Sequence, residues 1–136
     1  GGGLISGTAL SVRALSPTTR VIAAEPANAD DAKRSREAGE RLVEDAPNTI
    51  ADGLKASLGE LTWQFVASEI DDILLAEEHE IIEAMRLTWQ RMKIIIEPSC
   101  AVPLAAILRH RDVFAGKRVG VILTGGNVDL QRLPWA

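Results

Sequence analysis

Residues 72–93 read DILLAEEHEIIEAMRLTWQRMK, an apolar pentapeptide that runs directly into a long amphipathic segment. Asp72–Ala76 has the length and composition of a short buried strand. In Glu77–Lys93 apolar residues recur at intervals of three and four, which predicts a helix with one apolar stripe. Acidic residues in its first turn and basic residues in its last favour the same helix. A strand followed at once by a helix is the unit from which parallel α/β sheets are built.

The rest of the chain repeats this alternation of strands and helices. Two further apolar runs, Arg20–Ala24 (RVIAA) and Lys117–Leu123 (KRVGVIL), predict strands. The predicted helices are Leu4–Leu15, a segment from a cap at Asn28 or Asp30 to Gly39, Leu61–Ile70, and a helix that contains Leu104–Leu108 and ends before Gly116. Pro98 and Pro103 are expected near the start of this last helix. Glu40–Gly59 has weak periodicity and reads as a long ordered loop. Strands separated by helices indicate an α/β fold with a parallel sheet.

Composition limits the function classes. The 136 residues, 46% of them hydrophobic, are enough for one ordinary core and one domain. A formal net charge of −4 argues against a nucleic-acid binder, which needs clustered Lys and Arg. The single cysteine, Cys100, cannot form an internal disulfide and reads as a small buried thiol, so a cytoplasmic location is expected. No apolar run has the roughly 20 residues that a membrane-spanning helix needs.

Polar and glycine-rich segments are expected at one end of the predicted sheet. GGGLISG (residues 1–7) opens a helix, EPANADD (25–31) follows a strand, and TGGN (124–127) follows another. Ligands of parallel sheets collect at the carboxyl ends of strands and at the helix N-termini beside them. These three segments are therefore the candidates for a binding site.

Six sequence blocks occur in an order that resembles a known enzyme family. They are GGGLISG, VIAAEPANADDA, TIADGL, EIDDILLA, EPSCAVPLAAIL and VILTGGNVDL. Together they resemble the carboxyl-terminal half of fold-type II pyridoxal-phosphate enzymes, within them the serine racemase, threonine/serine dehydratase and 3-hydroxyaspartate dehydratase group. The resemblance implies a three-layer sandwich around a parallel sheet. It also implies that residues 1–136 form the carboxyl-terminal part of the cofactor-binding large domain, with the amino-terminal part and the small domain outside this chain.

The resemblance implies a set of cofactor-binding residues. Gly1, Gly2, Gly3 and Leu4 match the end of a loop whose N–H groups hold the cofactor phosphate, where any Cβ would keep the oxygens away. Thr124 matches the residue that hydrogen-bonds the pyridine nitrogen. Glu97 matches a glutamate near the ring edge, or is a helix-start acid. Gly53 matches a residue that closely approaches the cofactor.

The segment EPANADD matches a divalent-cation site of the same group. The resemblance implies that Glu25, the carbonyl oxygen of Ala29, and Asp31 are the ligands. Oxygen ligands, two of them anionic, suit Mg²⁺ or Ca²⁺ completed by waters. The alternative is that these carboxylates are ordinary acids at a helix N-terminus.

The resemblance also implies what the chain lacks. Family members bind the cofactor as a Schiff base to a lysine in the amino-terminal third, and no lysine here matches that motif. We therefore expect no catalytic residue in this chain, and expect it to be inactive alone. The implied whole enzyme is a dehydratase or racemase of serine, threonine or 3-hydroxyaspartate that is completed by an amino-terminal part. We expect it to be a homo-oligomer, commonly a dimer. The alternative is a non-catalytic degenerate module that binds a partner or a phosphorylated ligand.

Overall fold

The computed structural model describes residues 1–135, which form two parallel strands and a set of helices. In chain order the elements are α1 (Gly3–Leu15), β1 (Ile22–Pro26), α2 (Asp31–Ala38), the 3-10 helix η1 (Asp52–Leu54), α3 (Glu60–Glu69), β2 (Asp72–Ala76), α4 (Glu78–Met92), α5 (Pro98–Arg109) and α6 (Arg111–Phe114). The predicted strand 72–76 and the predicted helices are confirmed, with ends that differ by a few residues.

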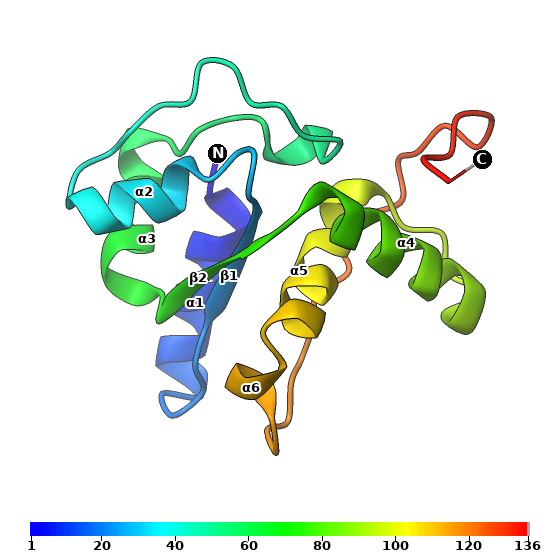
Figure 1. The fold of residues 1–136 in the computed structure, drawn as a ribbon. Coiled ribbons are helices and arrows are strands. Elements are labelled where there is room, and N and C mark those ends of the chain that lie inside the picture. The colour runs from blue at the N-terminus through cyan, green and yellow to red at the C-terminus, as the bar shows by residue number, and fades with distance from the viewer. Residues whose placement is uncertain (136) are drawn as a thin grey trace.

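The alternation of side chains along β2 produces the layers. β1 and β2 are parallel, with Ile22 opposite Asp72 and Pro26 opposite Ala76. Ile73 packs into a core shared with α1, α2 and α3, whereas its neighbour Leu74 packs into a core shared with α4 and α5. Successive strand residues face opposite sides of a sheet, so this small sheet is covered on both faces. Figure 1 shows α1, α2 and α3 on one side of the strands and α4, α5 and α6 on the other.

Apolar burial holds each helical layer to the sheet. On one side the buried residues include Ala9 of α1, Val66 of α3 and Val21 before β1. On the other side Ile81 and Met85 of α4 are fully buried against α5. Complete burial of such a side chain contributes about 1.5–3 kcal/mol. The result is the three-layer α/β arrangement around parallel strands that the sequence predicted.

The prediction of a third strand at 117–123 is wrong. This segment is not part of a sheet, and the two strands of residues 1–135 are β1 and β2. Val119, Val121, Ile122 and Leu123 are 37–53% exposed. A β-branched apolar run becomes a strand only when its backbone pairs with another strand, and the described chain offers this run no such partner.

The expected position of Pro103 is also wrong. α5 begins at Pro98, as predicted, but it continues through Pro103 to Arg109. Proline inside a helix lacks the N–H that would bond the carbonyl four residues earlier, here that of Ser99. The helix tolerates the loss because its flanking residues Val102, Ala105 and Ala106 are buried in the core.

None of the helices formed by residues 1–135 combines the length and apolar character needed to cross a membrane.

Candidate functional site

The predicted site segments lie at one end of the sheet. Figure 1 shows the amino terminus and the segment that follows residue 123 at the same end as the carboxyl ends of both strands. The amino ends of α1, α2, α4 and α5 lie at this end as well (Figure 1). The fold therefore brings four helix N-termini and the glycine-rich segments to one edge, where backbone N–H groups favour anions.

Among the opening glycines, Gly2 has a backbone conformation and surroundings that exclude a side chain. Gly2 has φ 82°, and a Cβ built on it would lie 2.7 Å from Leu58 Cδ2 and 3.0 Å from Thr62 Cβ. The hydroxyl of Thr62 donates to the Gly1 carbonyl at 2.6 Å. The Ser6 hydroxyl and N–H donate to the Gly2 carbonyl at 2.8 and 3.1 Å. Only glycine fits the backbone conformation and the space at position 2.

The same contacts leave N–H groups free. The carbonyl oxygens of Gly1 and Gly2 are engaged by side chains and by the helix, while the N–H groups of Gly3 and Leu4 have no acceptor within residues 1–135. The first N–H groups of any helix lack an intrahelical partner. Gly3 and Leu4 also border a groove of about 490 Å³ along α1. This helix end can therefore receive an anionic group.

The first turn of α5 joins the other predicted residues. The N–H of Asn127 donates to Glu97 Oε2 at 3.1 Å, and the N–H of Thr124 donates to Cys100 Sγ at 3.2 Å. The N–H of Gly53 donates to Ser99 Oγ at 2.9 Å. Two segments that are far apart in the sequence, around Gly53 and at 124–127, are thus held to one helical turn.

Close backbone approach also occurs beside Glu97. Its N–H donates to the Gly125 carbonyl at 3.1 Å, and a Cβ on Gly125 would lie 3.0 Å from Glu97 Oε1. A Cβ on Gly126 would lie 2.5 Å from the carbonyl oxygen of Ile95. The glycine pair after Thr124 therefore allows the loop to pack against the start of α5.

The structure joins the glycine end and the α5 turn through the 40–59 loop. The amino group of Gly1 donates to the Ala56 carbonyl at 3.3 Å, and the Gly59 N–H donates to Gly1 at 3.4 Å. Three residues before Ala56, Gly53 is bound to Ser99. One ordered loop thus contacts both groups of predicted cofactor residues, although the two groups make no hydrogen bond to each other within residues 1–135.

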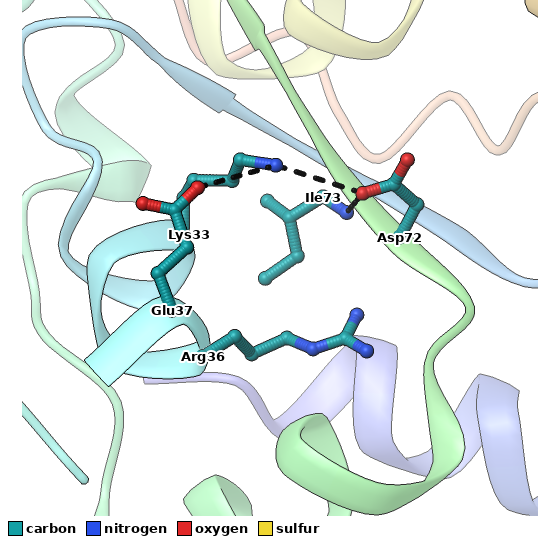
Figure 2. Close-up of a pocket in the computed structure, with 5 residues that line it drawn as sticks. All are labelled: Lys33, Arg36, Glu37, Asp72 and Ile73. Carbon is teal, nitrogen blue, oxygen red and sulfur yellow. Dashed lines mark hydrogen bonds and ion pairs between the residues drawn. The ribbon is translucent and has the colours of Figure 1, made fainter. Parts of the chain in front are cut away.

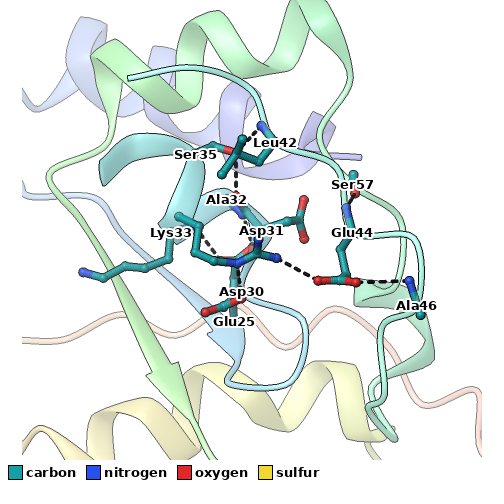
Figure 3. A network of polar contacts seen from close by, with 11 residues as sticks. Glu25, Asp30, Asp31, Ala32, Lys33, Ser35, Leu42, Glu44, Ala46 and Ser57 are labelled. Carbon is teal, nitrogen blue, oxygen red and sulfur yellow. Dashed lines mark hydrogen bonds and ion pairs between the residues drawn. The ribbon is translucent and has the colours of Figure 1, made fainter. Parts of the chain in front are cut away.

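Asn28 and Asp30 were the expected caps of α2, and Asp30 does stand at the N-cap position, but its side chain makes no capping hydrogen bond. The Asp30 side chain instead pairs with Arg34 at 2.7 Å, and Glu25 accepts the N–H groups of Lys33 at 2.9 Å and Ala32 at 3.3 Å. Figure 3 shows this network around the start of α2. The capping carboxylate comes from the strand because residues 27–30 turn the chain tightly back over it.

Glu25 lies close to two other carboxylates, Asp30 and Asp31. Burial raises the pKa of its carboxyl to about 7, and the charges of Asp31 and Asp30 add to this rise. Asp31 is only 4% exposed, and no Lys or Arg side chain of residues 1–135 forms an ion pair with Glu25 or Asp31. The Ala29 backbone is buried beside them. Within residues 1–135 no group of three His, Cys, Asp or Glu side chains converges as a metal site, so any cation here depends on the Ala29 carbonyl and on water.

A second hollow lies away from these residues. Lys33, Arg36, Glu37, Asp72 and Ile73 surround a surface cavity of about 220 Å³ (Figure 2). The Lys33 ammonium lies 3.7 Å from both Glu37 and Asp72. This cavity is at the amino end of β2, opposite the strand end that carries the predicted site.

Sequence reasoning missed Ser99, Thr62 and Cys100 as site residues. Ser99 contacts a residue 46 positions away, and Thr62 contacts one 61 positions away. The position of Ser99 and Cys100 two and three residues after Glu97 was the available signal, because residues of one helical turn share a neighbourhood.

Comparison with known proteins identifies close relatives. The family described as pyridoxal-phosphate dependent enzyme matches residues 1–125. The β-hydroxyaspartate dehydratase of Paracoccus denitrificans (strain Pd 1222) is 58% identical over 135 residues, which cover 99% of this chain and 43% of that protein. The serine racemase of Arabidopsis thaliana is 49% identical over 141 residues, covering 98% of this chain and 42% of that protein.

A solved structure agrees with these sequence matches. The structure of maize serine racemase superposes with a TM-score of 0.91 at 43% identity, covering 96% of this chain and 41% of that chain. The present chain therefore spans about two fifths of the length of the curated relatives that it matches.

Proposed function

The chain belongs to the pyridoxal-phosphate dependent enzyme family, and we propose that it supplies part of the cofactor site of a dehydratase or racemase. Its substrates would be small amino acids: serine, threonine or 3-hydroxyaspartate. The names of the relatives, a β-hydroxyaspartate dehydratase and serine racemases, support this choice. When bound, pyridoxal phosphate supplies an electron sink that makes the α-proton of an amino acid removable.

One observation carries the proposal. The free N–H groups at the start of α1 and the α5 turn that holds Thr124 lie at the same end of the sheet (Figure 1). The cradle fits a phosphate, because Gly2 keeps side-chain atoms away and the N–H groups of Gly3 and Leu4 remain available. In this proposal Gly1, Gly2, Gly3 and Leu4 bind the phosphate group.

The ring would lie against the α5 turn. Thr124 would offer its hydroxyl to the pyridine nitrogen, with Glu97 at the ring edge and Gly53 in close backbone contact. A hydroxyl cannot keep that nitrogen protonated as a carboxylate would, so the electron sink is weaker. Loss of a β-hydroxyl after removal of the α-proton then helps the reaction, which favours 3-hydroxy amino acids as substrates.

A divalent cation would order the segment between β1 and α2. The proposed ligands are Glu25, the Ala29 carbonyl and Asp31. Two carboxylates that form no ion pair with a Lys or Arg of residues 1–135, and the raised pKa of Glu25, support a bound Mg²⁺ or Ca²⁺. The ion would have a structural role, since it would fix the loop rather than contact the reacting atoms.

The remaining catalytic groups would come from an amino-terminal part that resembles the corresponding part of the relatives. That part would supply the cofactor-binding lysine and most of the substrate contacts, so the present chain alone would be inactive. A homo-oligomeric enzyme in the cytoplasm stays a prediction. The rival proposal of a non-catalytic module predicts no turnover under any complementation.

A chimera tests the proposed function. The 135 matched residues of the Paracoccus denitrificans dehydratase are replaced by this chain, which is 58% identical to them. We expect the chimera to bind pyridoxal phosphate and to release ammonia from 3-hydroxyaspartate, serine or threonine. A folded chimera that binds the cofactor but turns over none of the three would contradict the proposal and favour the module.

Thr124→Ala in the chimera tests the role of the hydroxyl. Because this hydroxyl would contact the ring and not the phosphate, we expect turnover to fall by roughly tenfold to a hundredfold while cofactor affinity changes little. Thr18→Ala is the matched control, since Thr18 is exposed beyond the carboxyl end of α1. Equal turnover of the Thr124 and Thr18 variants would remove Thr124 from the site.

A further inference from the structure

Ser99 joins two segments that the proposed function uses. It lies two residues after Glu97, in the first turn of α5, and its Oγ accepts the N–H of Gly53 at 2.9 Å. Gly53 is 46 residues earlier in the chain, within η1. The side chain therefore fixes the separation between the 49–54 segment and the turn that carries Glu97.

The Ser99 hydroxyl acts as both donor and acceptor in this joint between η1 and the first turn of α5. The Ser99 hydroxyl donates to Asp52 Oδ1 at 3.4 Å, while the same carboxylate oxygen accepts the Gly53 N–H at 2.9 Å. A Cβ on Gly53 would lie 3.0 Å from Ser99 Oγ, so any larger residue at position 53 would push the Ser99 side chain away from this contact. Serine supplies both an acceptor and a donor, which alanine cannot replace.

The other end of the same segment is also anchored. The N–H of Ile50 donates to Glu78 Oε2, at the start of α4, at 2.9 Å. Ala51, between the two anchors, is fully buried, and its N–H donates to Thr49 Oγ1 at 3.1 Å. With one end attached to α4 and the other to α5, the position of Gly53 depends on both helices.

We propose that Ser99 is a positioning residue for the cofactor ring. It holds the Gly53 backbone at a fixed distance from Glu97 and, through the same helical turn, from Thr124. Ser99 acts through Gly53 and makes no contact with reacting atoms. This inference rests on the proposed function, because it assumes that Gly53 contacts the bound cofactor.

The test uses the chimera with the Paracoccus denitrificans dehydratase, in which the rest of the proposed cofactor site is present, and four variants of it. Ser99→Ala removes the joint, Ser99→Thr retains the hydroxyl, and Gly53→Ala disrupts the joint from the other side. Ser57→Ala is the matched control, because the Ser57 hydroxyl also accepts a backbone N–H in the 40–59 loop, that of Glu44 at 2.9 Å, but is outside the α5 turn. Two quantities are measured: amide hydrogen exchange at Gly53 without cofactor, and the dissociation constant for pyridoxal phosphate by fluorescence.

We expect Ser99→Ala to increase exchange at Gly53 and to weaken pyridoxal phosphate binding, each by roughly fivefold, the effect of one lost hydrogen bond. Gly53→Ala should weaken binding similarly, Ser99→Thr should restore it to within about twofold, and Ser57→Ala should leave it unchanged. If Ser99→Ala does not fold, the Gly53→Ala and Ser99→Thr pair decides the question.

Two results would overturn the inference. Faster exchange at Gly53 with unchanged cofactor affinity would make Ser99 a purely structural residue. Unchanged exchange and unchanged affinity would show that the joint has no effect. Failure of the unmodified chimera to bind pyridoxal phosphate is a different result, because it removes the proposed function and the role of Ser99 together.

Discussion

At Gly2 a single residue determines whether the amino end can receive an anion. Its φ of 82° lies in the left-handed region, and the space beside it is filled by Leu58 and Thr62. An L-residue pays about 1–2 kcal/mol for that backbone conformation alone. The absence of a side chain is therefore a requirement of the fold at this position as well as of the proposed phosphate contact.

Gly2→Ala should lower the free energy of unfolding by about 1–2 kcal/mol or more, because the new Cβ would lie 2.7 Å from Leu58 Cδ2. Gly7→Ala is the control: Gly7 lies inside α1 with no atom within 4 Å of its Cβ position. This change should stabilise the chain by up to about 1 kcal/mol. Urea denaturation measures both, and an equal effect of the two substitutions would refute the geometric account.

Single residues also mark the limit of what the sequence reveals about the site. The glycines at 1–3 and Thr124 were implied by the resemblance to the enzyme family. Thr62 and Ser99 were not, because their partners are 61 and 46 residues away and hydrogen bonds between distant segments have no local pattern. Such contacts depend on the packing of whole helices.

At the scale of elements, the connection from β1 to α2 carries the strongest electrostatic signal. Glu25, near the carboxyl end of β1, accepts N–H groups at the start of α2 and lies beside the buried Asp31. Its pKa is raised from 4.5 to about 7. A strand residue that serves as a helix cap is invisible to sequence patterns, which search for the cap directly before the helix.

The pH dependence of stability follows from this pKa. Between about pH 4.5 and 7 the folded chain retains a proton that the unfolded chain has released, so stability falls as the pH rises through this window. Above it the penalty is constant, at about 3 kcal/mol for a rise of this size. The Glu25→Gln variant should lack the fall, whereas Glu37→Gln, on the exposed side of α2, should retain it.

Unfolding free energies at pH 4.5 and 7.5 check this prediction. Mg²⁺ should stabilise the unmodified chain at pH 7.5 more than at pH 5, because the cation binds the ionised carboxylates. A parallel pH dependence of the unmodified chain and Glu25→Gln would contradict the raised pKa. An effect of Mg²⁺ that survives Glu25→Gln would contradict the proposed ligands.

At the scale of the whole molecule, the most prominent feature is the apolar segment 117–123 outside the sheet. Its residues Val119, Val121, Ile122 and Leu123 are partly exposed. The strand was predicted because the segment is rich in apolar and β-branched residues, which is true of its sequence. What it could not supply is a neighbouring strand, which is a property of the fold rather than of the segment.

In the full chain the amides of residues 119–123 should exchange rapidly, because no ladder protects them. In the chimera with the Paracoccus denitrificans relative the same amides should become protected by at least roughly tenfold, since we expect the remaining part of that protein to supply a neighbouring strand. Hydrogen exchange with mass spectrometry compares the two. Protection in the isolated chain equal to that in the chimera would show that the segment already has a partner.

The layered architecture itself was predictable. The strand at 72–76, the helix that follows it and the alternation of strands and helices determine three layers, because Ile73 and Leu74 must face opposite sides. The placement of two distant segments, around Gly53 and at 124–127, on the first turn of α5 was not predictable, since it results from how the layers pack. The candidate site depends both on the layered fold and on how the helices of the layers pack.

The central claim is that the glycine end of α1 and Thr124 contact one cofactor molecule. The most direct test titrates the ¹⁵N-labelled chain with pyridoxal phosphate, with inorganic phosphate and with pyridoxal, and follows the backbone amide signals. The account predicts that pyridoxal phosphate shifts the signals of Gly2–Leu4 and of 124–126 with one dissociation constant, while inorganic phosphate shifts only the first group. Pyridoxal phosphate that shifts one group and leaves the other unchanged, or shifts neither, would contradict it.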